Sequence, residues 1–307
     1  MPDDIVVENL TKSYGSVHAV KDISFSVGRG EVFGILGPNG AGKTTTLECV
    51  EGLQPPTSGN MRVLGIDTRR EPDLVKERIG VQLQASAYFE HLTLTEILEL
   101  FGRFYRRSLP AEDLLGQVDL VEKAHTQVKH LSGGQQQRFA IAATLVNDPE
   151  VIFLDEPTTG LDPQARRNLW EFIQQIHGEG RTIVLTTHYM EEAQTLCQRV
   201  AIMDQGELVA LDTPANLIRG LDAPYQVRAL VQGAIPGDDV RGLDGVTGME
   251  LGDDSVLALQ SCDSTATVRA LFAWGERENA RIDRLEVRPA TLEDVFLART
   301  GRALETQ

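Results

Sequence analysis

The amino-acid sequence predicts an α/β protein, in which a mostly parallel sheet covered by helices is followed by a smaller α+β unit. Between residues 151 and 203, apolar stretches of strand length alternate with helical stretches, a pattern typical of parallel sheets flanked by helices. After residues 219–224, strand-like stretches surround a single helical one and the alternation stops. We therefore expect a main domain at residues 1–220 and a small C-terminal domain at residues 221–307.

The individual elements are expected at definite places along the chain. β-branched and aromatic residues bounded by glycine predict strands, and apolar residues at helical spacing predict helices. In the main domain, strands are expected at residues 5–7, 24–27, 31–36, 61–64, 80–83, 151–154, 182–187 and 200–203. Helices are expected there at residues 43–51, 94–106, 111–118, 133–147, 163–177 and 190–196. In the C-terminal domain, a mostly antiparallel sheet with a helix on one side is expected from strands at residues 226–231, 256–260 and 282–287 and a helix at 266–279.

The composition is that of an ordinary globular protein and disfavours several functional classes. Of the 307 residues, 41% are hydrophobic and 24% are charged, and the net charge is −16. So acidic a chain is a poor main partner for nucleic acid, because a phosphate backbone requires a basic surface. No apolar run approaches the roughly 18 residues that span a bilayer, and the acidic N-terminus does not resemble a signal peptide. We expect a cytoplasmic protein whose membrane role, if any, comes through a partner.

A glycine-rich loop between an apolar strand and a helix predicts a phosphate-binding site. The loop matches the pattern Gly-x-x-x-x-Gly-Lys-Thr at every specified position. Glycines allow backbone N–H groups to turn toward phosphate oxygens, and the N-terminus of the next helix adds a partial positive charge. The lysine can bridge the terminal phosphates, and the threonine hydroxyl can bind Mg²⁺. The loop consists of Gly37, Pro38, Asn39, Gly40, Ala41, Gly42, Lys43 and Thr44.

Two adjacent carboxylates follow the apolar strand expected at residues 151–154. Asp155 and Glu156 would then lie at the carboxyl end of a parallel strand, where open α/β sheets bind ligands. Buried carboxylates are costly unless a cation or a proton compensates their charge. Mg²⁺ would compensate Asp155, which leaves Glu156 free to polarise a water molecule aimed at the γ-phosphate. The alternative interpretation is a solvated pair of carboxylates at a strand end.

A second glycine-rich segment precedes the helix expected at residues 133–147. Ser132 and Gln135 fit a capping box, in which each side chain bonds the backbone N–H of the other residue. This motif does not explain Gly133 and Gly134, because each glycine costs about 1 kcal/mol against alanine in a helix. Two glycines are favourable where an anion must approach the backbone closely at a helix N-terminus. Since one chain already has one phosphate cradle, we expect this second cradle to serve the nucleotide of another copy.

Taken together, these motifs resemble those of ABC transporter ATP-binding subunits over about residues 4–220. Residues 37–44 resemble the Walker A motif, residues 151–156 the Walker B motif and residues 131–135 the ABC signature. Further landmarks of the family occur in the expected order. They are Tyr14 for the aromatic residue that stacks on adenine, Gln84 for the Q-loop glutamine (with Gln82 as the weaker alternative), Asp162 for the D-loop and His188 for the switch histidine.

The resemblance implies a P-loop NTPase core with a mostly parallel sheet, an antiparallel β subdomain and a helical subdomain at about residues 85–140. It also implies an ATPase that works as a head-to-tail homodimer enclosing two Mg²⁺–ATP. Glu156, His188 and Gln84 would be catalytic, and Thr44, Gln84 and Asp155 would hold Mg²⁺. In each site one chain would supply these residues together with Tyr14, the phosphate loop and Thr45, and the other chain would supply Ser132, Gly133, Gly134 and Gln135, with Asp162 nearby.

The resemblance further implies a separate integral-membrane permease as a partner. The helical segment at about residues 85–134 would carry the coupling to it, which would place the chain at the inner face of the cell membrane. Residues 289–297, followed by Thr300, Gly301 and Arg302, resemble the tail of daunorubicin-resistance-type exporter ATPases and so imply export of a drug, lipid or polysaccharide. We expect the C-terminal domain, which carries no cluster suited to chemistry, to clamp two copies together.

Two rival functions have the same core motifs. An importer ATPase would share the fold, but sugar importers often end in a small β-barrel that this tail does not resemble. A soluble ABC ATPase that acts on ribosomes or DNA would usually carry two cassettes or a long coiled-coil insertion, and this chain has neither. Intact Lys43, Glu156 and His188 speak against a degenerate regulatory subunit.

Overall fold

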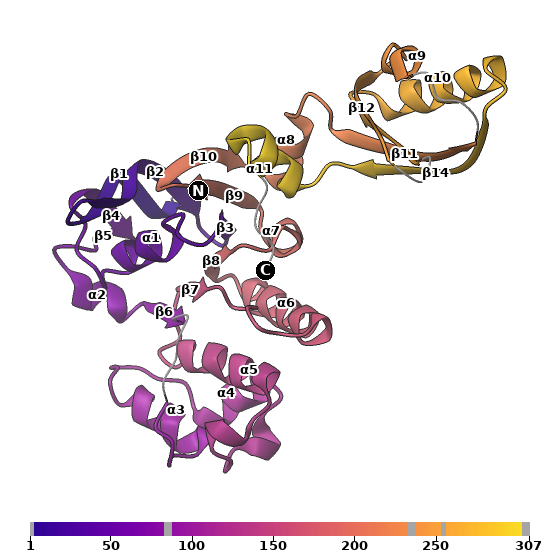
Figure 1. Ribbon diagram of the computed structural model, residues 1–307. Coiled ribbons are helices and arrows are strands. Elements are labelled where there is room, and N and C mark those ends of the chain that lie inside the picture. Colours follow the sequence, from indigo (N-terminus) through magenta and orange to yellow (C-terminus); the bar gives the residue numbers. More distant parts are fainter. Residues whose placement is uncertain (1–2, 83–87, 233–236, 253–255, 303–307) are drawn as a thin grey trace. The chain divides into compact units, whose positions relative to one another are not determined.

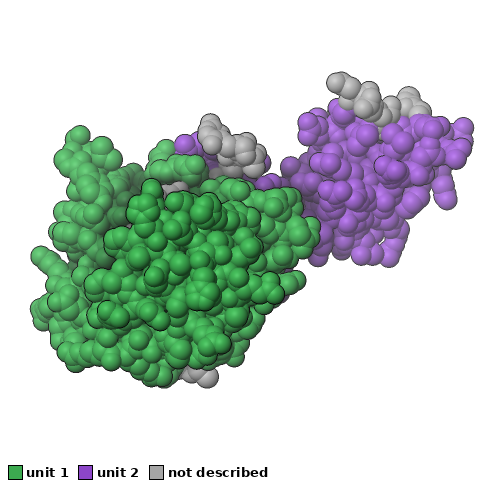
Figure 2. Space-filling model, turned by 90° about the horizontal axis from the view of Figure 1, so that it is seen from below, with its two compact units in different colours: residues 1–213 green, residues 214–307 purple. Residues whose placement is uncertain are grey.

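The computed structural model describes residues 3–82, 88–232, 237–252 and 256–302 and divides into two compact units (Figures 1 and 2). Unit 1 is Met1–Thr213 and unit 2 is Pro214–Gln307. Each unit has a hydrophobic cluster of its own, so each is described by itself. Along the chain, the boundary between the units follows Thr213, slightly before the boundary expected at Gly220.

Unit 1 is built on a six-stranded sheet of order β10-β9-β3-β8-β7-β6. All neighbouring strands are parallel except β10, which pairs antiparallel with β9. Strands β3, β7 and β8 are buried at every residue, as expected of strands covered by other elements on both faces. The predicted mostly parallel sheet is therefore confirmed. Its strands are β3 (Val32–Leu36), β6 (Ile79–Gln82), β7 (Val151–Asp155), β8 (Thr182–Thr187), β9 (Arg199–Asp204) and β10 (Glu207–Asp212).

A second, antiparallel sheet of order β2-β1-β4-β5 precedes and interrupts this core. It consists of β1 (Asp3–Tyr14), β2 (Val17–Gly28), β4 (Ser58–Val63) and β5 (Ile66–Asp67). Strands β1 and β2 are 12 residues each, much longer than the segments expected at residues 5–7 and 24–27. Register shifts break the alternation of buried and exposed residues, and Asn9 and Asp22 adopt positive φ, so the period of two is lost partway along each strand.

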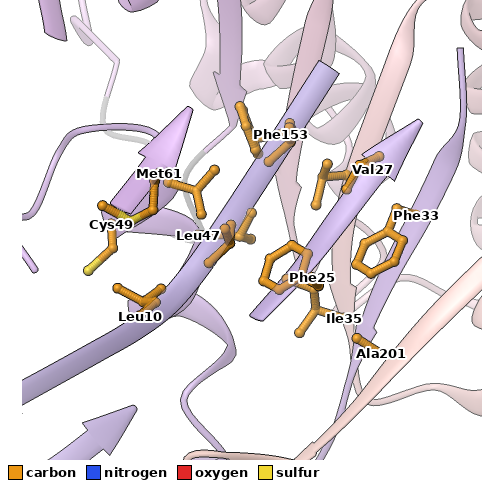
Figure 3. Close-up of a cluster of buried hydrophobic side chains, with 14 of the residues drawn as sticks. Leu10, Phe25, Val27, Phe33, Ile35, Leu47, Cys49, Met61, Phe153 and Ala201 are labelled. Atoms are coloured by element: carbon orange, nitrogen blue, oxygen red, sulfur yellow. The ribbon is translucent and has the colours of Figure 1, made fainter. Parts of the chain in front are cut away.

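Helix α1 (Lys43–Val50) contacts strands of both sheets. Its Leu47 and Cys49 lie in one buried cluster with side chains from the two sheets (Figure 3). In that cluster Phe25 of β2 stacks on Phe33 of β3, with ring centroids 5.4 Å apart. The helix that begins at the phosphate loop is thus fixed by close packing, which tolerates little displacement.

The remaining helices of unit 1 include a helical region between β6 and β7, confirming the expected helical subdomain (Figure 1). Its elements are α3 (Leu94–Gly102), α4 (Ala111–Gln117), η1 (Val121–Lys123), η2 (Val128–His130) and α5 (Gly133–Thr144). The other helices are α2 (Pro72–Lys76), α6 (Pro163–Gly178) and α7 (Met190–Leu196). Helix α5 ends before the expected Asn147, because the amide of that residue donates to carbonyls at the C-terminal end of α2 and in β6, Ile79 O at 2.9 Å among them.

Unit 2 contains a four-stranded antiparallel sheet of order β12-β13-β11-β14, as the sequence predicted. Helix α10 packs on one side of it, where Leu271 and Trp274 are buried with Val227 and Leu257. Strand β12 and helix α11 were not expected; α11 packs on α8 and buries Phe296. The elements are α8 (Pro214–Arg219), β11 (Tyr225–Gln232), α9 (Gly237–Arg241), β12 (Val246–Leu251), β13 (Val256–Ser261), α10 (Ser264–Arg277), β14 (Arg281–Pro289) and α11 (Leu292–Thr300). Within the described ranges of both units, no helix has the length and apolar character needed to cross a bilayer.

Candidate functional site

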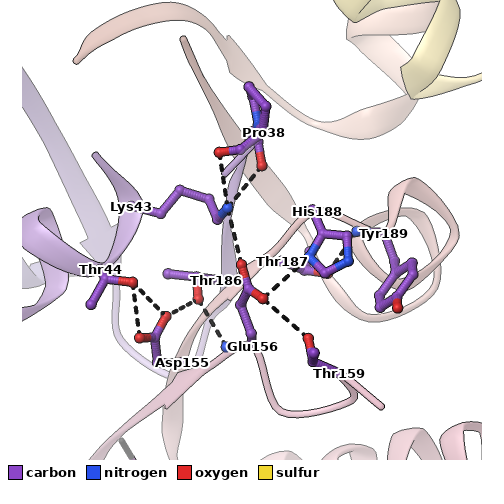
Figure 4. A network of polar contacts seen from close by, with 11 residues as sticks. Pro38, Lys43, Thr44, Asp155, Glu156, Thr159, Thr186, Thr187, His188 and Tyr189 are labelled. Atoms are coloured by element: carbon purple, nitrogen blue, oxygen red, sulfur yellow. Dashed lines mark hydrogen bonds and ion pairs between the residues drawn. The ribbon is translucent and has the colours of Figure 1, made fainter. Parts of the chain in front are cut away.

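The site lies at the carboxyl ends of three neighbouring strands of the parallel sheet. The order β3-β8-β7 places the phosphate loop after β3, His188 after β8, and the pair Asp155 and Glu156 at and after β7. Parallel strands end at the same edge of a sheet, so residues more than 100 positions apart converge there (Figure 4).

The phosphate loop closes tightly around the first residue of α1. Gly42 is the N-cap of α1 with φ 99°, and a Cβ there would lie 2.4 Å from Ala19 O, so no other residue fits. A Cβ at Gly37 would lie 2.3 Å from Met203 O. The Lys43 ammonium donates to Gly37 O at 2.8 Å and to Pro38 O at 3.2 Å, which folds the loop over the lysine.

Lys43 also forms an ion pair with Glu156, with Nζ 3.1 Å from Oε1 (Figure 4). Only 4% of the Lys43 side chain and 7% of the Glu156 side chain are exposed. Burial by itself would raise the pKa of Glu156, but the charge and hydrogen bond of Lys43, together with smaller effects of His188 and Thr159, outweigh it. The pKa of Glu156 is therefore held below its usual value, and the carboxylate is charged at neutral pH.

The backbone at Glu156 is strained and is held from β8. Its φ of 48° lies in the left-handed region, which is unfavourable for a residue with a Cβ. The Glu156 N–H donates to both Thr186 O (3.2 Å) and Thr186 Oγ1 (2.9 Å). On the side chain, the Thr159 hydroxyl donates to Oε2 at 3.1 Å, and His188 Nδ1 lies 3.2 Å from the same oxygen. Thr159 and Thr186 were missed by sequence reasoning, which saw them only as parts of a loop and a strand.

Asp155 and Thr44 offer the oxygen ligands that Mg²⁺ prefers. The Thr44 hydroxyl lies 3.0 and 3.3 Å from the two Asp155 carboxylate oxygens, and the Thr186 hydroxyl also donates to Asp155. Among the described residues, no group of three or more His, Cys, Asp and Glu side chains could hold a metal ion. The two protein ligands therefore fit an ion that also binds substrate phosphates and water, as Mg²⁺ usually does.

A cavity of about 710 Å³ opens beside the loop. Of the predicted residues it is lined by Tyr14, Asn39, Gly40, Gly42, Lys43, Thr44, Thr45 and Glu156. The Tyr14 ring is 46% exposed, and Lys12 Nζ lies 4.7 Å from its centroid. Val17, His18, Ala19, Lys21 and Gln205 also line the cavity and were not predicted, although four of them immediately follow Tyr14 in the β1–β2 hairpin.

The second glycine-rich segment takes no part in this cavity's described lining. The predicted capping box is present: Gln135 N donates to Ser132 Oγ at 3.3 Å, and Ser132 N donates to Gln135 Oε1 at 2.9 Å. A Cβ at Gly133 would meet nothing within 4 Å, and one at Gly134 only Ala165 at 3.4 Å. Asp162 caps α6, its Oδ1 accepting from Gln164 N and Ala165 N at 2.9 Å each. Packing within the chain therefore does not explain why Gly133 is glycine.

Gln84 lies outside the described residues, so its role stays a prediction. Gln82, the alternative, is buried on β6 and lines a groove of about 400 Å³ with Tyr88, Phe101 and Glu51. Glu51 was missed by sequence reasoning: it is only 2% exposed, and its Oε2 has no hydrogen-bond partner among the described residues. Burial, followed by the charges of Asp155 and Glu48, raises the pKa of Glu51 to about 8.

Comparisons with known proteins relate the whole chain to one family. The profile of the family described as "ABC transporter" matches residues 20–159. The linearmycin resistance ATP-binding protein LnrL of Bacillus subtilis is 36% identical over 97% of this chain and 98% of its own length. The Nod factor export ATP-binding protein I of Ralstonia nicotianae is 37% identical over 97% of this chain and 94% of its own. Among solved structures, the dimeric ATP-binding cassette MJ0796 bound to ADP and Pi has a TM-score of 0.62 and 30% identity, covering 68% of this chain and 98% of that one.

The buried ion pair predicts a pH-dependent loss of stability when Lys43 is replaced. In Lys43→Met, burial without the lysine charge should raise the pKa of Glu156, whereas in the native chain that pKa is lowered. In the native chain, the ionised Glu156 carboxylate stabilises the fold at pH values above the pKa that Glu156 has in the unfolded chain. In the variant, the Glu156 carboxylate has no lysine partner, so its ionisation destabilises the fold as the pH rises. We expect the variant to lose about 3 kcal/mol of unfolding free energy at pH 7.5 and clearly less at pH 5.

Urea unfolding at the two pH values measures this difference. Lys21→Met is the matched control, because Lys21 pairs with Glu207 at 3.3 Å with both side chains exposed and should matter little at either pH. An equal loss for Lys43→Met at pH 5 and pH 7.5 would contradict the assignment of a charged, lysine-stabilised Glu156.

Proposed function

This chain belongs to the ABC transporter family as an ATP-hydrolysing subunit, and we propose that it drives a separate membrane permease that exports its cargo. The observation that supports the proposed site most strongly is the convergence of Lys43, Glu156 and His188 beside the cavity that contains Tyr14. Two relatives named for linearmycin resistance and Nod factor export match nearly the whole chain, including unit 2. Their names favour export over the import alternative, and they support a drug or polysaccharide as the class of cargo.

In the proposed chemistry, adenine stacks on Tyr14 and the phosphates enter the loop from Gly37 to Thr45. Backbone N–H groups and the N-terminus of α1 bind the phosphate oxygens. Thr44 and Asp155 would hold Mg²⁺, which would neutralise phosphate charge and orient the terminal phosphate. Gln84 is expected to complete that set.

Glu156 is the proposed general base and His188 its partner. Because its pKa lies below the usual value, Glu156 is ionised and can accept a proton from the attacking water. Before Glu156 accepts that proton, the Lys43 ammonium must turn from Glu156 Oε1 toward a phosphate. The carboxylate and the phosphate compete for this one ammonium group. We infer that this exchange makes the base available when substrate is in place.

We further propose that each site is completed by a second copy. Ser132 and Gly133 are exposed at the N-terminus of α5, and no packing within the chain requires glycine at position 133. Both features suit a cradle for phosphates bound by the partner copy, with Gly134, Gln135 and Asp162 close to the same interface. The dimeric form of the solved cassette MJ0796 supports this arrangement.

The permease is proposed to dock in the groove formed by α1, β6, α3 and α5. Its aromatic wall (Tyr88, Phe101 and Tyr105) suits an apolar segment, and Glu51 offers a buried oxygen without a partner among the described residues to a donor on that segment. Such docking would place the chain at the inner face of the membrane. The clamp role of unit 2 stays a prediction, supported by a hydrophobic cluster separate from that of unit 1.

Glu156→Gln tests the proposed base. The variant keeps the shape of the side chain but loses its proton-accepting charge, so kcat for ATP hydrolysis should fall by about a hundredfold or more. ATP binding should persist, and ATP should trap a dimer detectable by size-exclusion chromatography with light scattering. A steady-state ATPase rate equal to that of the native chain would sink the assignment.

Mixing two inactive variants tests the shared site. Lys43→Ala and Ser132→Arg should each be nearly inactive alone, because every site of either homodimer carries a lesion. A mixed dimer places both lesions in one site and leaves the other intact, so equimolar mixtures should regain up to about a quarter of native activity, assuming random pairing and independent sites. Mixtures that remain as inactive as their parents at all protein concentrations would rule out a composite site.

A further inference from the structure

A stack of side chains lies beside the switch histidine and extends it toward helix α6. The Tyr189 ring lies 4.1 Å, centroid to centroid, from the His188 imidazole. On the same tyrosine, the Arg166 guanidinium lies 4.1 Å from the ring centroid. Figure 4 shows His188 and Tyr189 side by side next to Glu156. The three side chains form what we call the arginine–tyrosine–histidine stack.

The imidazole has little else to fix its orientation. His188 Nδ1 lies 3.2 Å from Glu156 Oε2, but within the described part of the chain it makes no hydrogen bond of good geometry. One quarter of the His188 side chain is exposed, so packing on all sides does not hold it either. Among the described residues, the imidazole contacts the Tyr189 ring as its aromatic neighbour.

The far end of the stack is anchored more firmly. Arg166 Nε is buried without a hydrogen-bond partner among the described residues, so the guanidinium gains from the face of the Tyr189 ring, as cations do over aromatic rings. Glu192 lies nearby and is fully buried: burial raises the pKa of its carboxyl group, the charge of Arg166 lowers it to a smaller extent, and its Oε1 accepts from Trp170 Nε1 at 2.9 Å. The backbone of the tyrosine is also fixed, because Tyr189 N donates to Thr187 Oγ1 at 2.9 Å.

We propose that Tyr189, held by Arg166, is a positioning residue that sets the orientation of His188 toward Glu156. The inference rests on the proposed role of His188 in ATP hydrolysis. The stack also connects His188 to the helix capped by Asp162. Arg166 lies one turn into α6, and its backbone N–H donates to Asp162 O at 2.9 Å. A change at that helix terminus would reach His188 through the stack.

Four variants test the stack through steady-state ATP hydrolysis. Tyr189→Leu removes the aromatic face and should lower kcat at least about tenfold, because small misplacements of reacting groups are costly. KM should change less than kcat, since neither Tyr189 nor Arg166 belongs to the described lining of the nucleotide cavity. Tyr189→Phe keeps the ring and should restore nearly native kcat. Arg166→Gln should lower kcat, whereas Arg167→Gln, at an exposed position of the same helix, should not.

The decisive comparison repeats Tyr189→Leu in a His188→Ala background, measured as single-turnover hydrolysis at high enzyme concentration. If the tyrosine acts through the histidine, it should cause no further loss there. If Tyr189→Leu slows hydrolysis equally in the native and His188→Ala backgrounds, the inference is wrong. It is also wrong if Tyr189→Leu and Arg166→Gln both keep native kcat, and in either case the proposed function is unaffected. Native activity of His188→Ala by itself would instead overturn the proposed role of the histidine, and the inference with it. If Tyr189→Leu fails to fold, Arg166→Gln in the two backgrounds gives the same test.

Discussion

The site depends on one buried ion pair, between Lys43 at the start of α1 and Glu156 after β7. Neither charge could be desolvated alone, because an isolated buried ion is far too costly. The pair therefore requires the phosphate loop and the acidic strand end to be in register. That register comes from the neighbouring strands β3, β8 and β7 and from the packing of α1 against both sheets.

Threonine hydroxyls around the pair carry much of the positioning. Thr186 bonds the Asp155 carboxylate and also receives the N–H of Glu156, so one side chain of β8 fixes both acidic residues. Thr159 bonds the Glu156 carboxylate, and Thr187 fixes the backbone of Tyr189. Strand β8 thus supports Glu156, the proposed base, on one side and the segment of His188 and Tyr189 on the other. This arrangement explains how a residue with unfavourable φ can persist at position 156.

The sequence predicted the centre of the site better than its edges. Walker A and Walker B residues are contiguous in the chain, and each motif follows or includes an apolar strand that fixes its place, so Lys43, Thr44, Asp155 and Glu156 were predicted directly. Thr186 and Glu51 could not be identified, because their contacts join elements far apart in the sequence and no local pattern marks them. The twelve-residue strands β1 and β2 were predicted too short, because bulges interrupt the alternation of buried and exposed residues along them. Gln84 falls outside the described residues, and its role is still a prediction.

If Lys43 must leave Glu156 to bind a phosphate, then removing the carboxylate charge should strengthen nucleotide binding. Titration calorimetry with Mg²⁺–ADP, which neither protein hydrolyses, compares the native chain with Glu156→Gln directly, and the lysine reaches the β-phosphate of ADP as well. Glu150→Gln is the control, because its partner Arg78 is exposed and lies outside the described lining of the nucleotide cavity. We expect Glu156→Gln to bind ADP about tenfold more tightly, which corresponds to about 1.4 kcal/mol, and the control to bind as the native chain does. Equal or weaker binding by Glu156→Gln would contradict the exchange of Lys43 between the carboxylate and the phosphate.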